Sequence, residues 1–126
     1  MSGRKTRSKL LLTERALRDI SEIEAYSIGQ WGKRTASKSI ADLEAALVRV
    51  QEKPELLRPE PDFHADLRFH RINKHVLVCD VQPKLILLLT VIHASRDIPS
   101  RLAELQPTLT AEVEMLHKKL RAGKKK

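Results

Sequence analysis

The stretch from Lys84 to His93, Lys-Leu-Ile-Leu-Leu-Leu-Thr-Val-Ile-His, constrains the fold more than any other part of the chain. Nearly every position in it is apolar, whereas a strand with one solvent-facing side alternates apolar and polar residues. The run is too short to cross a membrane, which takes about 18 to 20 apolar residues. It therefore predicts the central strand of a small sheet, buried on both faces, with polar residues where it ends.

Two amphipathic helices are predicted before this strand, after a short first strand over residues 8–12. Thr13 is a suitable N-cap for the first helix, and Gly32 is a natural stop because glycine accepts positive φ angles. A stripe of apolar residues with steps of 3 and 4 indicates the second helix; it contains Ala36, Ile40, Leu43, Leu47 and Val50. The short break between the helices predicts an antiparallel hairpin whose apolar faces pack on the sheet.

The second half of the chain contains a loop, three strands and a C-terminal extension. Three prolines in residues 53–65 indicate a loop, and an antiparallel meander of three strands follows it. These strands are expected over residues 66–72, 75–81 and 85–93. The fold class is therefore α+β, a helical hairpin packed on a small twisted antiparallel sheet in the order β-α-α-β-β-β. Beyond it we expect a helical turn at 100–105, a break at Pro107 and a separate helix at 110–122.

Basic residues gather at the two ends of the chain. The formal net charge is +8, and ten of the 24 lysines and arginines lie in residues 1–9 and 118–126, which hold no acidic residue. The ends are therefore expected to be flexible cations that bind nucleic acid without sequence preference. The expected organisation is a basic tail at 1–7, one folded domain at 8–105, and an extension with a helix and a basic tail at 106–126.

The sequence gives no support to a metal site, a cofactor site or a membrane anchor. The five histidines lack paired metal-ligand spacing, and the four glycines do not form a phosphate-binding loop. No signal peptide or spanning segment is recognisable, so we expect a cytoplasmic protein without cofactor, metal or membrane partner. The single cysteine, Cys79, is expected to be a small buried apolar residue.

Two groups of residues are candidates for a functional site. His93, Arg96 and Asp97 follow the buried strand, whose backbone would fix a charged contact or an acid–base group there. The competing interpretation is a solvated turn with a weak Arg–Asp ion pair.

The second group is a basic surface that would grip RNA phosphates, formed by Arg68, His70, Arg71 and His75. The competing interpretation is an ordinary solvent-facing side of the sheet. Tyr26 and Trp31 are expected to lie in the first helix, away from these strands, which argues against base stacking. Trp31 is interpreted as a packing anchor.

Several short motifs, taken in order, resemble the RelE/ParE superfamily of bacterial toxins, and within it the ParE or plasmid-stabilisation branch. The match covers about residues 8–105. The motifs are Leu-Thr-Glu-Arg-Ala-Leu-Arg-Asp-Ile at 12–20, Gln-Trp-Gly at 30–32, the Ala-Leu stripe of the second helix, Pro54 with Arg58, Leu-Arg-Phe at 67–69, Asn-Lys-His-Val at 73–76, and Val-Ile-His-Ala-Ser-Arg-Asp-Ile-Pro at 91–99.

The resemblance implies the toxin of a type II toxin–antitoxin system, neutralised by a ParD-like antitoxin. A ParE-like toxin inhibits DNA gyrase by binding and has no catalytic residues; its candidate contacts here are His93, Arg96 and Asp97. A RelE-like toxin instead cuts messenger RNA on the ribosome. No tyrosine follows Tyr26, which departs from the RNase pattern, and a third possibility is a non-toxic assembly module with the toxin fold. The RNase alternative would use Arg68, Arg71, His75, His93 and Arg96.

Overall fold

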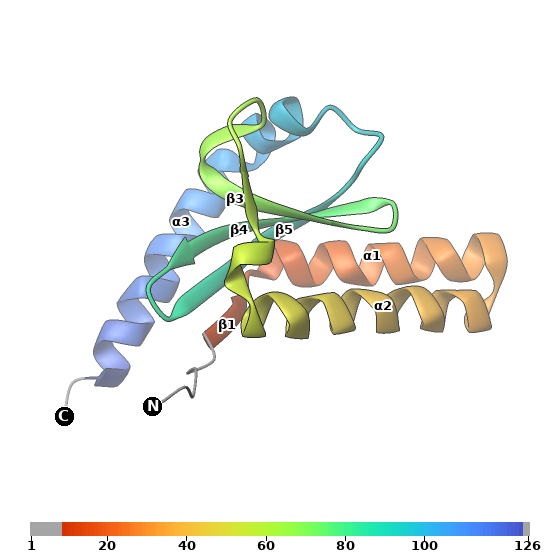
Figure 1. Ribbon diagram of the computed structural model, residues 1–126, viewed down its shortest axis with the longest axis horizontal. Coiled ribbons are helices and arrows are strands. Elements are labelled where there is room, and N and C mark those ends of the chain that lie inside the picture. Colours follow the sequence, from red (N-terminus) through yellow and green to blue (C-terminus); the bar gives the residue numbers. More distant parts are fainter. Residues whose placement is uncertain (1–8, 125–126) are drawn as a thin grey trace.

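The computed structural model of the chain describes residues 9–124, so the basic tail expected at 1–7 lies outside the described residues. A five-stranded sheet carries a helical hairpin on one face and a long C-terminal helix on the other (Figure 1). The elements follow one another as β1 (Lys9–Leu12), α1 (Glu14–Trp31), α2 (Lys33–Glu52), a 3-10 turn (Pro54–Leu56), β2 (Arg58–Glu60), β3 (His64–Ile72), β4 (His75–Gln82), β5 (Leu85–His93) and α3 (Ile98–Lys124). The α+β class, the element order and the C-terminal helix agree with the prediction.

The strand predicted from the apolar run is β5, which is hydrogen-bonded on both sides. The sheet order is β1-β5-β4-β3-β2, so β5 is an interior strand, while β4 occupies the middle position. Every residue from Ile86 to Ile92 is buried, which confirms burial on both faces. The expectation of a wholly antiparallel sheet is wrong in one respect: β1 runs parallel to β5, with Lys9 opposite Leu85 and Leu12 opposite Leu88. The hairpin α1–α2 supplies the long connection that a strand parallel to β5 requires.

The helical hairpin begins and turns where its sequence predicted. The Thr13 hydroxyl accepts the Ala16 N–H at 3.0 Å and caps α1. The same hydroxyl donates to the Leu89 carbonyl at 2.7 Å, which ties the start of α1 to β5. Gly32, with φ of 90°, separates the two helices, and a residue with a Cβ would be strained at that angle. The buried side chains between hairpin and sheet include Leu43, Leu47, Val50, Leu77, Cys79, Ile86, Leu88 and Val91.

The C-terminal helix α3 is longer than the sequence predicted. It runs without a break from Ile98 to Lys124 and contains Pro107, so the expected break and the separate helix at 110–122 are wrong. A proline inside a helix costs about 3 kcal/mol because one hydrogen bond is lost. Burial of an apolar face against the sheet offsets that cost: Ile98, Leu102, Leu105 and Leu109, all buried, recur at helical spacing.

The loop expected at residues 53–65 contains a short edge strand. Residues 58–60 form β2, which pairs antiparallel with β3, Arg58 lying opposite Phe69. Pro59 is tolerated in this strand because its missing N–H is not needed at the edge of a sheet. Pro59 therefore lies in an edge strand, whereas Pro54 and Pro61 lie in turns on either side of it, so the expected loop is only partly present.

A β-bulge interrupts the pairing of β4 with β5 and reverses the alternation of side chains in β5. Val78 pairs with Thr90 and Cys79 pairs with Leu88, so Leu89 is an extra residue. Before the bulge, Leu87 and Leu89 face α3. After it, Val91 belongs to the core beneath the hairpin. After the bulge, the odd-numbered residues of β5, including His93, therefore face the hairpin.

Candidate functional site

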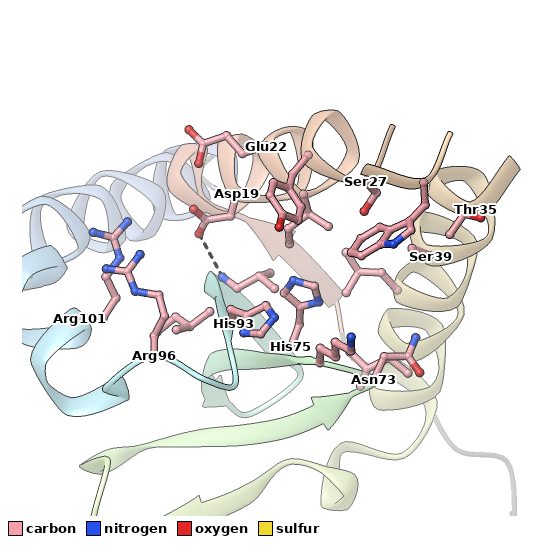
Figure 2. Close-up of a pocket in the computed structure, with 18 residues that line it drawn as sticks. Asp19, Glu22, Ser27, Thr35, Ser39, Asn73, His75, His93, Arg96 and Arg101 are labelled. Carbon is pink, nitrogen blue, oxygen red and sulfur yellow. Dashed lines mark hydrogen bonds between the residues drawn. The ribbon is translucent and has the colours of Figure 1, made fainter. Parts of the chain in front are cut away.

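A hollow lies between the helical hairpin and the ends of β3, β4 and β5. Its volume is about 810 Å³, within the size range of ligand sites. Figure 2 shows His75 and His93 in the middle of this pocket, Arg96 and Arg101 toward one end, and Thr35, Ser39 and Asn73 toward the other. We call it the strand-end pocket.

The two imidazoles are brought together by the register of β4 and β5. His75 lies opposite His93, and their ring centroids are 5.2 Å apart with the rings at 80°. His93 is exposed, and its Nδ1 accepts the Ser95 N–H at 3.1 Å. Partial burial lowers the pKa of His75 below its ordinary value of 6.5, and the nearby charge of His93 lowers it further. His75 is therefore neutral at pH 7, which suits it to exchange a proton or to hydrogen-bond a neutral group.

Arg96 and Asp97 have different roles in the turn between β5 and α3. Arg96 is exposed and lines the pocket, and no ion pair within residues 9–124 involves it. Asp97 instead caps α3, because its carboxylate accepts the Ser100 hydroxyl at 3.0 Å and lies 3.4 Å from the Ser100 N–H. Asp97 does not line the pocket, so the structure brings together only His93 and Arg96 of the three strand-end candidates.

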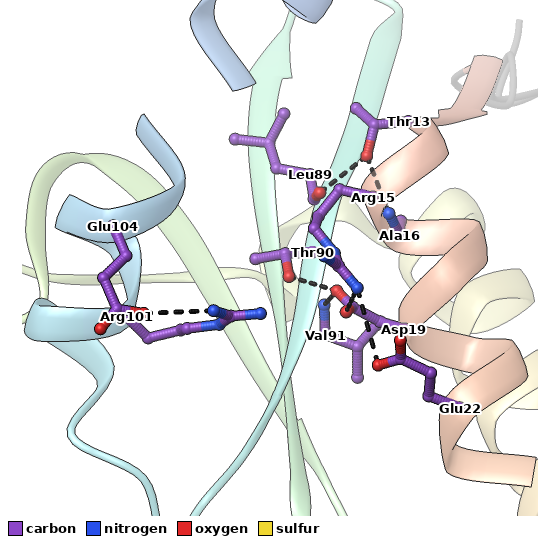
Figure 3. A network of polar contacts seen from close by, with 10 residues as sticks. All are labelled: Thr13, Arg15, Ala16, Asp19, Glu22, Leu89, Thr90, Val91, Arg101 and Glu104. Carbon is purple, nitrogen blue, oxygen red and sulfur yellow. Dashed lines mark hydrogen bonds and ion pairs between the residues drawn. The ribbon is translucent and has the colours of Figure 1, made fainter. Parts of the chain in front are cut away.

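A buried carboxylate fixes the position of β5 relative to α1 (Figure 3). Asp19 accepts the Val91 N–H at 3.1 Å and also the Thr90 hydroxyl, and it pairs with Arg15 at 2.8 Å. β1 ends at Leu12, opposite Leu88, so the rest of β5 has no neighbouring strand on that side. Thr13 and Asp19 supply hydrogen-bond partners there instead: the Thr13 hydroxyl donates to the Leu89 carbonyl, and Asp19 accepts the Val91 N–H. This network holds the end of β5, and therefore His93, in a fixed position beneath α1.

Replacing Asp19 by alanine should destabilise the protein by about 2 to 4 kcal/mol. The Val91 N–H and the Thr90 hydroxyl would lose their buried acceptor, and Arg15 would lose its charge partner. Chemical denaturation measures the loss. Glu24→Ala is the matched control, because Glu24 is an exposed acid of the same helix. Equal stability of the two variants would contradict the structural role of Asp19.

The basic surface expected on β3 does not form as one patch around the histidines. Arg68 and Arg71 do not line the pocket, and the Arg71 Nε donates to the Asn73 carbonyl at 3.3 Å. Arg71 lies opposite Val76, whose side chain packs on the α3 side of the sheet, so it belongs to the other face. His70 lies near Leu56 and Arg49, and burial lowers its pKa. Of the five residues of the RNase alternative, the pocket contains His75, His93 and Arg96.

Two aromatic residues that the sequence analysis placed away from the strands line the pocket. Tyr26 and Trp31 contact each other edge to face at 5.9 Å, and the Lys74 Nζ lies 6.0 Å from the centre of the Trp31 ring. Trp31 is 56% exposed, so the prediction of a packing anchor is wrong. The prediction missed that the end of α1, at the turn of the hairpin, lies beside the β3–β4 turn at Asn73–Lys74.

Other chemistry receives no support from the described residues. Cys79 is buried, and burial raises the pKa of its thiol to about 12, which leaves it protonated and inert. Within residues 9–124 no cluster of three histidine, cysteine or acidic side chains has a geometry that would hold a metal ion. No helix in the same range is long and apolar enough to cross a membrane.

Comparison with known proteins gives a family and a fold. A family model described as "ParE toxin of type II toxin-antitoxin system, parDE" matches residues 10–98. A solved structure titled as the chromosomal ParDE system from P. aeruginosa is similar with a TM-score of 0.63 and 18% identity, covering 71% of this chain and 98% of that one. The RelBE2 toxin–antitoxin complex from Mycobacterium tuberculosis is similar with a TM-score of 0.52 and 16% identity, covering 70% and 99%. No curated protein matches.

Proposed function

We propose that this chain, which belongs to the ParE toxin family of type II toxin–antitoxin systems, inhibits DNA gyrase by binding to it. The family match covers β1 through the start of α3. Of the residues that line the strand-end pocket, Arg101 alone lies outside the matched range. A toxin of this kind needs a rigid contact surface, and it needs no bond-breaking chemistry of its own.

The observation that carries the proposal is the position of Arg96, an exposed residue whose backbone is held in place and whose guanidinium has no ion-pair partner within the described residues. It follows a strand that is buried on both faces and anchored by Asp19, and it precedes a helix capped by Asp97. A backbone held in this way presents the arginine at a defined place on the surface, and arginine is common among residues that dominate interface energies. His93 supports it by fixing the turn through Ser95.

Neutralisation by a cognate ParD-like antitoxin is the second part of the proposal. Similar solved chains are titled as a ParDE system and as a toxin–antitoxin complex. The groove beside the helical hairpin and the outer edges of β1 and β2 offer docking sites for a helical or extended peptide. We expect a stable complex with the antitoxin and poor recovery of the toxin alone.

Two assays with the purified protein test the proposed target. The first measures supercoiling by gyrase, and the second follows the integrity of messenger RNA in a translation extract. Inhibited supercoiling with intact messenger supports the proposal. Messenger cleavage with normal supercoiling would overturn it in favour of an endonuclease, and the absence of both effects would indicate a non-toxic assembly module.

Arg96→Ala should raise the concentration needed for half-inhibition of gyrase by about tenfold or more. Loss of one charged interface hydrogen bond typically costs about 1.5 to 3 kcal/mol, and 1.4 kcal/mol corresponds to a factor of ten. The fold should be retained, because Arg96 is exposed and forms no ion pair in the described part of the chain. Arg58→Ala is the matched control, since Arg58 is exposed on β2 outside the pocket. A fully active His93→Ala/Arg96→Ala double variant would show that this edge is only a solvated turn.

Cleavage of messenger RNA on the ribosome is a second candidate, favoured by one specific observation. The ring centroids of His75 and His93 lie 5.2 Å apart beside Arg96, and two adjacent imidazoles are suited to proton transfer to and from a bound RNA. In that case His93→Ala would lower the cleavage rate without changing ribosome affinity.

A further inference from the structure

One wall of the strand-end pocket is aromatic, and the proposed contact of Arg96 with gyrase does not involve it. Tyr26 and Trp31 are 63% and 56% exposed, although both line a hollow and each contacts the other ring. Lys74 approaches one face of Trp31 at the limit of a cation–π contact, and the exposed fraction of the indole remains open. Exposed aromatic rings inside a hollow provide a surface on which a flat ring of a ligand stacks.

The charges around the pocket favour an anion. The acids of its wall, Asp19 and Glu22, both lie within ion-pair distance of Arg15, at 2.8 and 3.6 Å. Arg101 is paired with Glu104 at 3.1 Å. Arg96 and Lys74 have no acidic partner within residues 9–124, so they leave positive charge that a ligand would neutralise.

We propose that the strand-end pocket binds a nucleotide, with its base against Trp31 and Tyr26 and its phosphate at Arg96 and His93. Figure 2 shows Arg96 on one side of the two histidines and Asn73 on the other; Lys74, which follows Asn73, contacts Trp31. Trp31 therefore lies toward the Asn73 end of the pocket and Arg96 toward the other end, and His75 lies between them, where a sugar would pass. The volume of about 810 Å³ accommodates a ligand of this size. The proposed binding shares Arg96 and His93 with the proposed gyrase contact, but it does not require gyrase to be the target.

Two sources would supply the same base and phosphate: a free mononucleotide, or the 5′-phosphorylated end of a single strand. Trp31 is the one tryptophan of the chain, so its fluorescence reports directly on the pocket. The experiment titrates the full chain with AMP, adenosine, inorganic phosphate and a short 5′-phosphorylated oligoadenylate, and it follows the quenching of this fluorescence. Equal affinity for AMP and the oligonucleotide assigns the free nucleotide as source, and clearly tighter binding of the oligonucleotide assigns the strand end.

Variants test whether AMP binds in the strand-end pocket. AMP should quench saturably in the unaltered protein, and adenosine and phosphate should each bind at least tenfold more weakly. Arg96→Ala should weaken AMP binding about tenfold through the phosphate, and Tyr26→Leu should weaken it through the base. Arg58→Ala, outside the pocket, should leave it unchanged. AMP should also raise the melting temperature of the unaltered protein more than that of Arg96→Ala.

Three outcomes would overturn the proposal. They are absence of saturable quenching by AMP, equal binding of AMP and inorganic phosphate, and AMP binding that survives both Arg96→Ala and Tyr26→Leu. The second and third would assign the signal to the basic ends of the chain. None of these measurements contains gyrase, so their failure is separate from a failure of the proposed toxin target.

Discussion

Leu87→Asp should unfold the protein. Leu87 is fully buried in β5 and packs against the part of α3 that contains Leu105 and Leu109. A carboxylate placed there would have no partner, and an unpaired buried charge costs several kcal/mol even when it is neutralised by protonation. Because the total stability of a domain is about 5 to 15 kcal/mol, this single change removes most or all of it. Circular dichroism and thermal unfolding measure the result.

The matched control for Leu87→Asp introduces the same charge at a partly exposed strand position. Val81 lies on the neighbouring strand β4 and is 37% exposed, so Val81→Asp should lower the stability only slightly. Cooperative unfolding of Leu87→Asp near the normal temperature would contradict the burial of β5 on both faces.

Ending the chain after Leu105 should destabilise it severely and cause aggregation. The deletion removes Leu109, Val113 and Leu116, which cover Leu87 and Leu89. A fully buried apolar side chain such as Leu109 contributes about 1.5 to 3 kcal/mol, and the partly buried Val113 and Leu116 add to this, so the loss is a large part of the stability of a small domain. Yield of soluble protein and binding of a hydrophobic dye measure the exposed surface. The predicted domain end at residue 105 would then fall inside a structural element.

A shorter deletion provides the control for this truncation. Ending the chain at Lys124 removes two residues beyond α3 and should leave the melting temperature unchanged. If the chain that ends at Leu105 folds as stably as this control, the part of α3 after Leu105 is dispensable and the domain boundary expected from the sequence is right.

The helices and the buried strand could be predicted because their signals are local. The steps of 3 and 4 in α2, the Thr13 cap and the apolar run of β5 each determine an element within a few neighbours. The continuity of α3 through Pro107 could not be predicted in this way, because the energy that offsets the proline comes from the distant sheet face at Leu87 and Leu89. The parallel pairing of β1 likewise depends on a partner 76 residues away.

The pocket was harder to predict than the fold because it depends on two features that leave no local signal. The first is the bulge at Leu89, which turns His93 toward the hairpin and is invisible in a run where every residue is apolar. The second is the position of the end of α1 beside the β3–β4 turn, which brings Trp31 to Lys74. His93 and Arg96 were identified from their place after a buried strand, whereas Tyr26 and Trp31 were placed too far away.

The pairing of β1 with β5 also delays the completion of the sheet during synthesis of the chain. Residues 9–12 leave the ribosome early, but their partners at 85–88 follow only after both helices and three further strands have been made. Such a distant contact forms late because a long loop must close first. His93 and Arg96 are added later still, and α3 must then cover the second face of the sheet. The sheet of the nascent chain is therefore complete, and His93 and Arg96 reach their final positions, only when almost all of the chain has been translated.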